Sequence, residues 1–286
     1  AARRGCRLAA VTFSPDPARV LSPGAAPSDL LSSDDREYAL LDAGVDAVLV
    51  FSFTPELAAI PYERFVREGL CSLFDVRAIV VGEDFCLGAR GAGDVSSLRE
   101  LGRRNGFDVI GVELAQIDGR AITATRIRSL VERGNVEEAC ELLGHCHVVK
   151  GVVEHGRGEG TGFGFPTANV RVSEGLCMPA EGVYAGYVVV GSALGTNHVG
   201  QRAYPAAINV GKPRTFSPGE EGERFLEATL LGFEGDLYER SVSIVFVRWL
   251  RGPRTFGSVE ELEQALASGG RTDLLFLDIR LGREDG

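Results

Sequence analysis

Features that would indicate a membrane, a nucleic acid or an oxidising compartment are missing from this sequence. No apolar run approaches the roughly 20 residues that a membrane-spanning helix needs. The net charge is −10 and no block is rich in Lys and Arg, whereas a nucleic-acid partner usually requires a basic face. The six cysteines include no Cys-x-x-Cys pair. We therefore expect reduced, mostly buried thiols in a cytoplasmic protein that binds neither nucleic acid nor membrane.

The glycine-rich stretch Gly151–Val170 is the most specific part of the chain, although it lacks the marks of the common phosphate loops. No Gly-Lys-Ser/Thr follows its glycines, and no Gly-x-Gly-x-x-Gly opens a helix there. Glycines let a backbone approach a ligand closely and offer N–H groups to phosphate oxygens. Here they stand at Gly156, Gly158, Gly160, Gly162 and Gly164.

Thr167 and Asn169 follow these glycines at a spacing of two residues. On an extended segment their side chains therefore point the same way. Two neutral oxygen ligands beside a phosphate cradle suit a complex of Mg²⁺ with a nucleotide. The alternative is a glycine-rich turn between strands, in which both side chains bond to the local backbone.

The first half of the chain alternates strand-like and helix-like segments. Short runs rich in Val, Ile and Leu predict buried strands at 8–13, 45–51, 77–82 and 107–112. Helical spacing, with glycines at several ends, predicts helices at 34–43, 63–74, 96–105, 125–133 and 136–143. This alternation predicts a doubly wound α/β domain, Rossmann-like, over residues 1–146.

The second half, residues 147–286, consists mainly of strand-like segments. Strands are expected at 148–154, 183–190, 204–210, 225–231 and 241–249, before a helix at 259–267. Sequential short strands predict an antiparallel barrel or sandwich with a C-terminal helix. At the boundary, His145, Cys146 and His147 could suggest a metal cluster, but consecutive residues rarely converge on one ion, so a linker is favoured.

The hexapeptide Gly164–Asn169, Gly-Phe-Pro-Thr-Ala-Asn, closely resembles the ATP-binding signature of riboflavin kinases. The resemblance implies that Gly156, Gly160, Gly164, Thr167 and Asn169 bind ATP, and that Thr167 and Asn169 hold Mg²⁺. The same family tends to carry arginines just before the hexapeptide, where this chain has Glu159 and Thr161. We expect some charge compensation of the phosphates to be lost there.

Glu227 lies in a strand-like segment in which it shares a face with Thr229, opposite the face of Leu226, Ala228 and Leu230. A carboxylate on such a strand is usually a solvent-facing side chain. The pattern Leu-Glu-x-x-Leu-Leu-x-Phe, however, resembles the riboflavin kinase segment that supplies the catalytic base. The resemblance implies that Glu227 takes the proton of a primary hydroxyl as that hydroxyl attacks the γ-phosphate.

Two further kinase motifs imply flavin contacts. Asn209-Val210-Gly211 resembles the start of Asn-Ile/Val-Gly-x-x-Pro-Thr-Phe, with Pro213 one place early and Arg214 in the usual proline position. Arg251 matches the arginine of Leu-Arg-x-x-x-x-Phe, which lies near the flavin in that family; the alternative is a solvated surface arginine. The resemblance thus implies a flavin site that includes Asn209 and Arg251.

The N-terminal half resembles bacterial FMN adenylyltransferase domains. Residues 12–17 resemble Thr-Phe-x-Pro-His-Pro with Asp16 in place of the histidine, residues 82–88 resemble Gly-x-Asp-Phe-x-Phe-Gly, and residues 122–128 resemble Ile-Ser-Ser-Thr-Arg-Ile-Arg. A hydroxyl and an arginine at a helix start favour anion binding. The resemblance implies an adenylyl site of Gly82, Asp84, Phe85, Thr125, Arg126 and Arg128.

The whole chain therefore resembles the prokaryotic bifunctional riboflavin kinase/FMN adenylyltransferases, also called FAD synthetases. The family's leading strand and His-x-Gly-His segment have no counterpart in this sequence, which begins with Ala1 rather than Met. We expect little FAD synthesis by the chain as given. The resemblance implies an enzyme that uses MgATP to convert riboflavin to FMN. A diverged, non-catalytic flavin- or nucleotide-binding paralogue with a regulatory role is the alternative.

Overall fold

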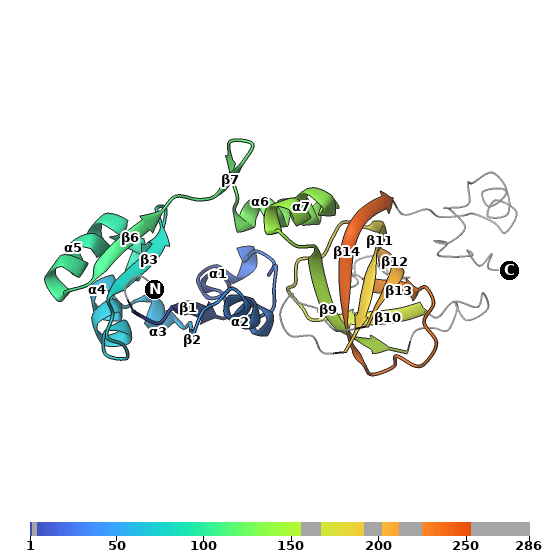
Figure 1. Ribbon diagram of the computed structural model, residues 1–286, viewed down its shortest axis with the longest axis horizontal. Helices are drawn as coiled ribbons and strands as arrows, with labels where there is room; N and C mark the ends of the chain where they lie inside the picture. The colour runs from blue at the N-terminus through green and yellow to red at the C-terminus, as the bar shows by residue number, and fades with distance from the viewer. Residues whose placement is uncertain (2–4, 156–166, 192–201, 212–224, 253–286) are drawn as a thin grey trace, which may run out of the picture. The chain divides into compact units, whose positions relative to one another are not determined.

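The computed structural model describes residues 1, 5–155, 167–191, 202–211 and 225–252 (Figure 1). The chain forms two compact units. The first unit comprises residues 1–27 and 36–123, and the second comprises residues 28–35 and 124–286.

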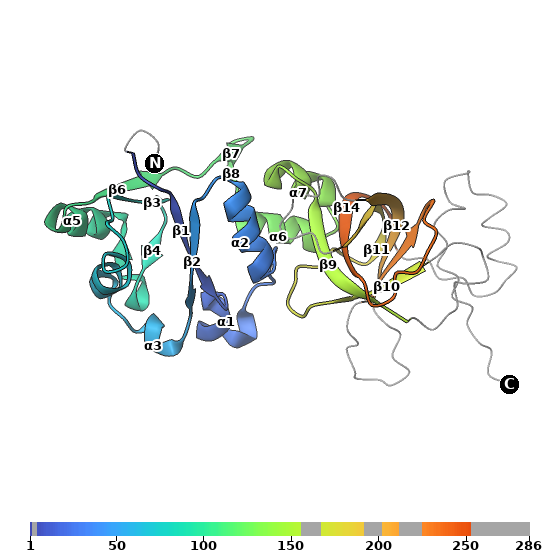
Figure 2. The same ribbon diagram turned by 60° about the horizontal axis from the view of Figure 1, so that its bottom comes forward.

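The first unit contains two pairs of parallel strands, as the alternation of strands and helices predicts. β1 (Ala9–Ser14) pairs with β2 (Ala47–Ser52), and β3 (Ala78–Gly82) pairs with β6 (Asp108–Val112). Parallel neighbours require a crossover, and helical segments supply it (Figure 2). The connection from β1 to β2 contains α1 (Pro17–Leu21), η2 (Pro23–Ala25) and α2 (Ser33–Asp42), and the connection from β3 to β6 contains η4 (Ala89–Gly91) and α5 (Val95–Asn105). Between β2 and β3 lie α3 (Pro55–Ala58), α4 (Tyr62–Arg64) and η3 (Phe65–Leu70). Short hairpin strands are β4 (Cys86–Leu87), β5 (Gly93–Asp94), β7 (Gln116–Ile117) and β8 (Arg120–Ala121).

Helix α5 has the sequence signals of a well-defined helix at both ends. Asp94 caps its start by accepting a hydrogen bond from the Ser97 amide at 2.7 Å, and Gly106 ends it with φ +83°. Its apolar stripe buries Leu98 and Leu101 against Phe107. The helix expected at 63–74 is divided differently: α4 passes into a six-residue π-helix, η3, that ends at Leu70.

The second unit is built on a closed antiparallel barrel with the strand order β10-β13-β12-β11-β14-β9. Five of its strands confirm the segments expected from the sequence. These are β9 (His147–Glu154), β11 (Gly182–Val190), β12 (Ala203–Gly211), β13 (Phe225–Leu230) and β14 (Ser241–Arg251). The sixth, β10 (Thr167–Val172), had been considered only as an extended piece of the glycine-rich motif.

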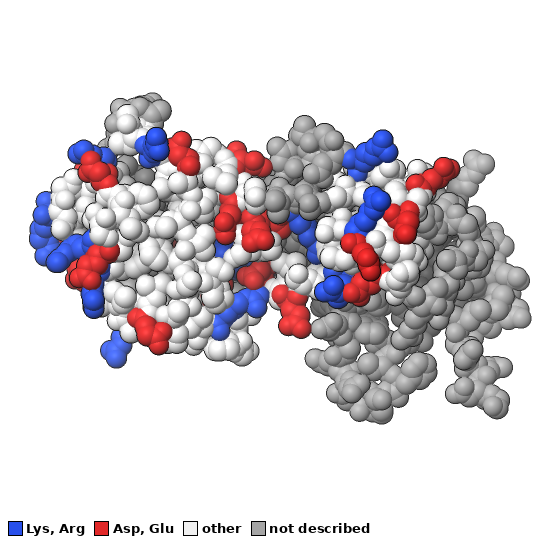
Figure 3. Space-filling view, turned by 90° about the horizontal axis from the view of Figure 1, so that it is seen from below, with Lys and Arg blue, Asp and Glu red and all other residues white. Residues whose placement is uncertain are grey.

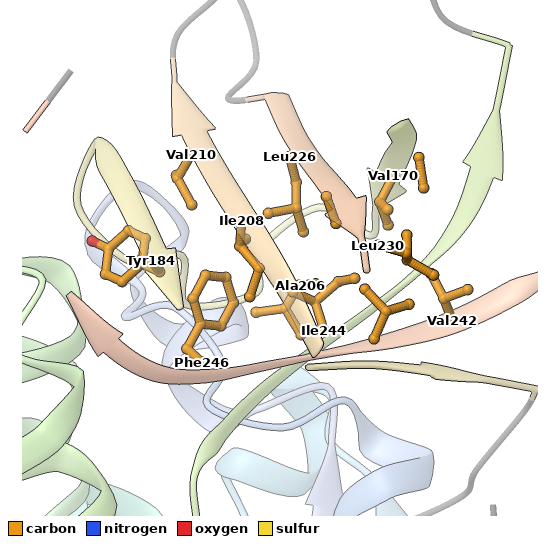
Figure 4. Packing of buried hydrophobic residues seen from close by; sticks show 14 of the residues in the cluster. Val170, Tyr184, Ala206, Ile208, Val210, Leu226, Leu230, Val242, Ile244 and Phe246 are labelled. Atoms are coloured by element: carbon orange, nitrogen blue, oxygen red, sulfur yellow. The ribbon is translucent and has the colours of Figure 1, made fainter. Parts of the chain in front are cut away.

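The barrel interior is filled by large apolar side chains from alternate positions of each strand (Figure 4). Tyr184, Ile208, Leu226, Ile244 and Phe246 are each less than 2% exposed. Burying apolar surface of this kind is the dominant stabilising contribution to such a fold. The expected helix at 259–267 lies outside the described residues.

Helices α6 (Ala124–Glu132) and α7 (Val136–Leu143) pack with the barrel in the second unit. Asn135 caps α7, accepting a hydrogen bond from the Glu138 amide at 3.3 Å, as the sequence predicts. Val136 is fully buried and belongs to the barrel's core cluster. The sequence had placed both helices in the first domain, with a boundary at 146/147; the compact units instead divide after Thr123.

A short segment from the N-terminal part of the chain, residues 28–35, belongs to the second unit. The Cys177 amide donates to the Asp29 carbonyl at 2.8 Å, and the Asp29 amide donates to the Gly175 carbonyl at 2.7 Å. Asp35, which is only 6% exposed, forms an ion pair with Lys150 of β9. Nothing in the local sequence pattern of residues 28–35 predicts this long-range pairing.

The expectation about the cysteines is only half confirmed. All six are free thiols, but only Cys177 is buried; Cys86 is exposed and the other four are intermediate. Cys6, Cys71 and Cys146 lie in loops or turns, where less of the side chain is covered than inside a core. None of the helices in the described ranges has the length and apolar character required to cross a membrane.

Candidate functional site

Three of the polar residues singled out in the sequence lie side by side on the outside of the barrel. Asn169 of β10 is directly opposite Glu227 of β13, and Glu227 is directly opposite Asn209 of β12. Residues opposite each other in an antiparallel pair point to the same face of the sheet. Their neighbours along the strands are buried in the barrel, so these three side chains, here called the polar rung, lie on its outer face.

A second row of side chains runs beside the polar rung. Thr167 of β10 is opposite Thr229 of β13, and Thr229 is opposite Ala207 of β12. Thr167 and Asn169 therefore share the outer face of β10, as their spacing predicts. Directly opposite side chains have Cβ atoms about 4.5–5.5 Å apart, so the oxygen donors of β10 lie next to the carboxylate of Glu227.

The donor set on β10 fits a magnesium ion. The Thr167 hydroxyl and the Asn169 amide offer hard oxygen atoms, which Mg²⁺ prefers, and both side chains are half-buried on one face. Within the described residues, no group of three or more His, Cys, Asp and Glu side chains could hold a metal ion. A magnesium ion at this face would therefore depend on Thr167, Asn169 and the phosphate oxygens of a nucleotide.

Glu154 and Arg171 form an exposed ion pair at the β9 end of the same row. Glu154 is directly opposite Asn169, and its carboxylate accepts a hydrogen bond from the Arg171 guanidinium. The two side chains are 50% and 63% exposed, so the pair contributes little to stability. It does place a positive and a negative charge beside Asn169.

Arg251 lies on the same row of the barrel as Asn209, two strands away. Asn209 is opposite Val183 of β11, and Val183 is opposite Arg251 at the end of β14. The guanidinium of Arg251 donates to the Gly252 carbonyl at 3.3 Å. The two residues expected to contact flavin are thus on one outer row with β11 between them.

The remaining kinase residues expected from the sequence, Gly156, Gly160 and Gly164, lie outside the described residues, as do Pro213 and Arg214. Their roles stay predictions.

The residues of the expected adenylyl site fall into two groups, one in each unit. Gly82 ends β3, and the Phe85 amide donates to its carbonyl at 3.1 Å, which closes a tight turn. A Cβ atom at Gly82 would lie 2.8 Å from Oδ1 of Asp84, so the turn leaves little room for a side chain there. Asp84 is exposed, whereas Phe85 packs against the core of the first unit.

The second group lies in the first turns of α6, in the second unit. Thr125 is exposed. Arg126 forms an ion pair with Glu138 at 3.3 Å, and Nε of Arg128 donates to the Ser28 carbonyl at 2.6 Å. Both arginines thus make structural contacts inside the second unit in addition to any contact with a ligand.

Asp16, which departs from the histidine of the family motif, has a structural role. Its side chain caps α1 by accepting a hydrogen bond from the Ala18 amide at 2.9 Å, with Pro17 at the first helical position. Asp at the N-cap and Pro at the first helical position both favour the start of a helix.

A buried histidine, His147, and a half-buried cysteine, Cys140, lie near the start of β9. Burial lowers the pKa of His147 to about 4, and its Nε2 is 2.8 Å from the Cys177 carbonyl. Burial and the neighbouring Cys146 thiol raise the pKa of Cys140 to about 12. A buried imidazole with a lowered pKa is a weak base, and a thiol with a raised pKa stays protonated near neutral pH, which indicates structural rather than catalytic roles.

Charges of both signs are mixed on the surface. On the described part of the face in Figure 3, Lys and Arg side chains alternate with Asp and Glu side chains on each unit. The described part of this face shows no broad basic area.

The sequence motifs identify each member of the polar rung separately, but they do not predict that the three residues lie opposite one another on neighbouring strands. The period of two in β13 had placed Glu227 and Thr229 on one face, and the structure confirms this because Leu226, Ala228 and Leu230 are buried. Pairing between strands that are distant in the chain leaves no local signal, so neither the register of Asn169 with Glu227 nor the position of Thr229 opposite Thr167 could be read from the sequence.

Comparisons with known proteins match two different family models to the two halves of the chain. The family model described as FAD synthetase matches residues 1–126, and the one described as Riboflavin kinase matches residues 143–271. A crystal structure described as a macrolide-efflux protein from Streptococcus pneumoniae is similar with a TM-score of 0.77 and 26% identity, over 96% of this chain and 84% of that one.

Curated relatives match nearly the whole chain. The bifunctional riboflavin kinase/FMN adenylyltransferase of Escherichia coli K12 is 31% identical over 265 residues, which are 93% of this chain and 81% of that protein. The protein of the same name from Bacillus subtilis is 28% identical over 268 residues, with the same coverage of both chains. The chain belongs to the family of bifunctional riboflavin kinase/FMN adenylyltransferases.

Proposed function

We propose that the chain is an enzyme of flavin nucleotide biosynthesis whose second unit transfers the γ-phosphate of ATP to riboflavin and produces FMN. The observation that carries the proposal is the polar rung, which aligns Asn169, Glu227 and Asn209 across three neighbouring strands on the outside of the barrel. The family models and the curated relatives reported above all name enzymes, which supports catalysis rather than a purely regulatory role.

The order of the strands suggests how the rung works. Glu227 lies between Asn169, on the side proposed for the ATP phosphates, and Asn209, on the side proposed for the flavin. A carboxylate in this position can accept the proton of the riboflavin 5′-hydroxyl as its oxygen attacks the γ-phosphorus. The proton moves to Glu227, the new O–P bond forms, and ADP leaves.

Thr167 and Asn169 would hold the magnesium ion that accompanies ATP. When bound, Mg²⁺ neutralises negative charge on the phosphates. The role of the two side chains is to fix the phosphates against the end of β10, beside Glu227. Asn209 and Arg251 would orient the flavin, so that its hydroxyl meets the carboxylate in line with the phosphate.

The first unit would contribute to the second step, transfer of an adenylyl group from ATP to FMN. Gly82, Asp84 and Phe85, on the turn after β3, are the residues of this unit proposed for it, whereas the roles of Thr125, Arg126 and Arg128, at the start of α6 in the second unit, stay predictions. A tight turn with a partly buried aromatic side chain lets the backbone approach a nucleotide closely.

A direct assay tests the kinase activity. The full chain is incubated with riboflavin, ATP and Mg²⁺, and FMN and ADP are measured by chromatography. We expect equal amounts of the two products, no reaction in EDTA, and no ADP release with lumiflavin, which lacks the ribityl hydroxyl. Absence of riboflavin-dependent ADP from a folded chain would contradict the proposal.

A further inference from the structure

Helix α7 ends in a tight turn that leads directly into the first strand of the barrel. The helix lies against β14 and β9 (Figure 1). Gly144 ends it with φ +76°, in the left-handed region, and the Gly144 amide donates to the Cys140 carbonyl at 2.9 Å. This turn redirects the chain, so that Cys146, the residue before β9, lies beside Cys140 in the last turn of the helix.

The Cys140 thiol is held at the first pair of residues between β9 and β14. Its Sγ donates to the Phe246 carbonyl at 3.7 Å, and Phe246 is directly opposite His147. The His147 amide donates in turn to the Cys140 sulfur. Because His147 directly follows Cys146 in the chain, these contacts fix the Cys140 sulfur next to the segment that carries the second thiol.

The thiols of Cys140 and Cys146 are hydrogen-bonded to each other. Both side chains are half-buried, so a small oxidant in solution can reach them. A disulfide requires two sulfur atoms about 2 Å apart. Thiols that are already in contact reach this separation by rotation of their side chains, with little movement of the main chain.

We propose that Cys140 and Cys146 form a reversible redox modification site, at which hydrogen peroxide converts the two thiols into a disulfide. The disulfide joins the last turn of α7 to the residue before β9, so the helix becomes covalently tied to the barrel against which it packs. A thiol reductant reverses the modification by exchange. The inference does not depend on the proposed kinase function.

Cys146 supplies the attacking thiolate, because burial and the neighbouring Cys146 thiol raise the pKa of Cys140 and keep that thiol protonated. In the first step the Cys146 sulfur attacks one oxygen of the peroxide. The S–O bond forms, the O–O bond breaks, and the leaving hydroxide takes up the proton that Cys146 has lost. The product is a sulfenic acid at Cys146.

In the second step the Cys140 sulfur attacks the sulfur of the sulfenic acid. The S–S bond forms and the S–O bond breaks, and the hydroxide that leaves takes up the proton of Cys140 to give water. Two thiols together lose two electrons, and one hydrogen peroxide is reduced to two molecules of water. Both sulfurs are already in place for this step, since the thiols of Cys140 and Cys146 are in contact.

The test treats the full chain with hydrogen peroxide and follows it by intact mass and by peptide mapping without reductant. We expect a mass lower by about 2 Da, a single cross-link between Cys140 and Cys146, and a fall from six titratable thiols to four. Dithiothreitol should restore the original mass. Cys146→Ser should show no cross-link. Cys140→Ser, which keeps the attacking thiol but removes its partner, should accumulate a sulfenic acid at Cys146 that dimedone traps.

The cross-link should also change the stability of the second unit. A disulfide restricts the unfolded chain, and for the short loop 140–146 we expect the urea midpoint of the oxidised wild type to rise by about 0.5 M. Peroxide should leave the midpoint of Cys146→Ser unchanged. A cross-link that does not raise the wild-type midpoint would overturn the inference that it ties α7 to the barrel.

Cys86→Ser is the matched control, because Cys86 is the exposed thiol of the six. This variant should form the same cross-link as the wild type, at the same rate. The inference is overturned if the folded wild type keeps all its thiols or is oxidised only at Cys86. It is also overturned if the mapped link joins other cysteines, or if Cys146→Ser loses the same mass. Phosphorylation of riboflavin is measured separately on the reduced chain, so its failure would refute the proposed function alone.

Discussion

At the scale of the single residue, Glu227 is the group on which the proposed chemistry depends most. Replacing it with Gln keeps the shape and one hydrogen-bonding oxygen but removes the basic carboxylate. We expect Glu227→Gln to lower kcat by about 10²–10⁴ while KM for ATP changes little. Single-turnover measurement of FMN formation gives the rate of the chemical step.

Glu174→Gln serves as the control, since Glu174 is an exposed carboxylate on the loop that follows β10. It should retain the wild-type rate. A Glu227→Gln variant that is as fast as this control would exclude Glu227 as the general base.

His147 predicts a pH dependence of stability. Its pKa is lowered to about 4 by burial, against 6.5 for an ordinary histidine, with a smaller contribution from the charge of His145. The unfolded chain therefore binds the proton more tightly than the folded one, and the free energy of unfolding falls as the pH is lowered from about 6.5 towards 4. Below pH 4 both states are protonated, and this contribution is lost.

The measurement is urea unfolding at pH 7, 5.5 and 4.5 for the wild type and for His147→Gln. A shift of this size corresponds to a loss on the order of 3 kcal/mol across the window. We expect the difference in stability between the two proteins to shrink by about that amount as the pH falls. Parallel profiles for the wild type and His147→Gln would contradict the argument.

At the scale of the element, most helices and strands followed from the sequence because their signals are local. Helix α7 begins and ends at the residues expected, since Asn135 and Gly144 mark its two ends. Strand β13 shows a clean period of two, which identified its outer face. Strand β10 was not counted because glycines and a proline precede it, and these residues mark turns more strongly than strands.

The elements that the sequence could not predict depend on distant partners. Residues 28–35 are mostly polar and include only the start of α2, yet they are bonded to the barrel through Asp29 and Asp35. The candidate site has the same limitation: its members could be named from motifs, whereas their alignment in one rung is a property of strand register. Register is fixed by the packing of the buried faces along whole strands, not by the site residues.

The ion pair between Asp35 and Lys150 should be important for this attachment. The Asp35 side chain is 8% exposed and that of Lys150 is 23% exposed, so removing one partner leaves a nearly buried charge. We expect Lys150→Met to lower the free energy of unfolding by about 3 kcal/mol, and the double variant Lys150→Met/Asp35→Asn to recover part of the loss. Chemical unfolding measures both values. Arg77→Met, which breaks an exposed pair with Asp75, should cost less than about 1 kcal/mol. Equal losses of stability in Lys150→Met and Arg77→Met would show that burial of the Asp35–Lys150 pair is unimportant.

At the scale of the whole molecule, the limits of the barrel domain are a prediction that can be tested by truncation. The sequence places a domain at 147–286, whereas the compact unit also includes residues 28–35, α6 and α7. In α7, Val136 and Ala139 are fully buried and Leu142 is 6% exposed. A fragment that begins at residue 147 would uncover the surface against which these side chains pack.

We therefore expect the fragment 124–286 to be more stable than the fragment 147–286, because it retains α7. Each buried Val or Leu contributes about 1.5–3 kcal/mol, so the difference should amount to several kcal/mol. Urea midpoints of the two fragments and of the full chain, followed by circular dichroism, give the comparison. The full chain should have the highest midpoint for barrel unfolding, since it alone supplies Asp29 and Asp35. If 147–286 unfolds at the same midpoint as 124–286, then α7 is not part of the barrel's cooperative unit, and the boundary near residue 147 is the correct one.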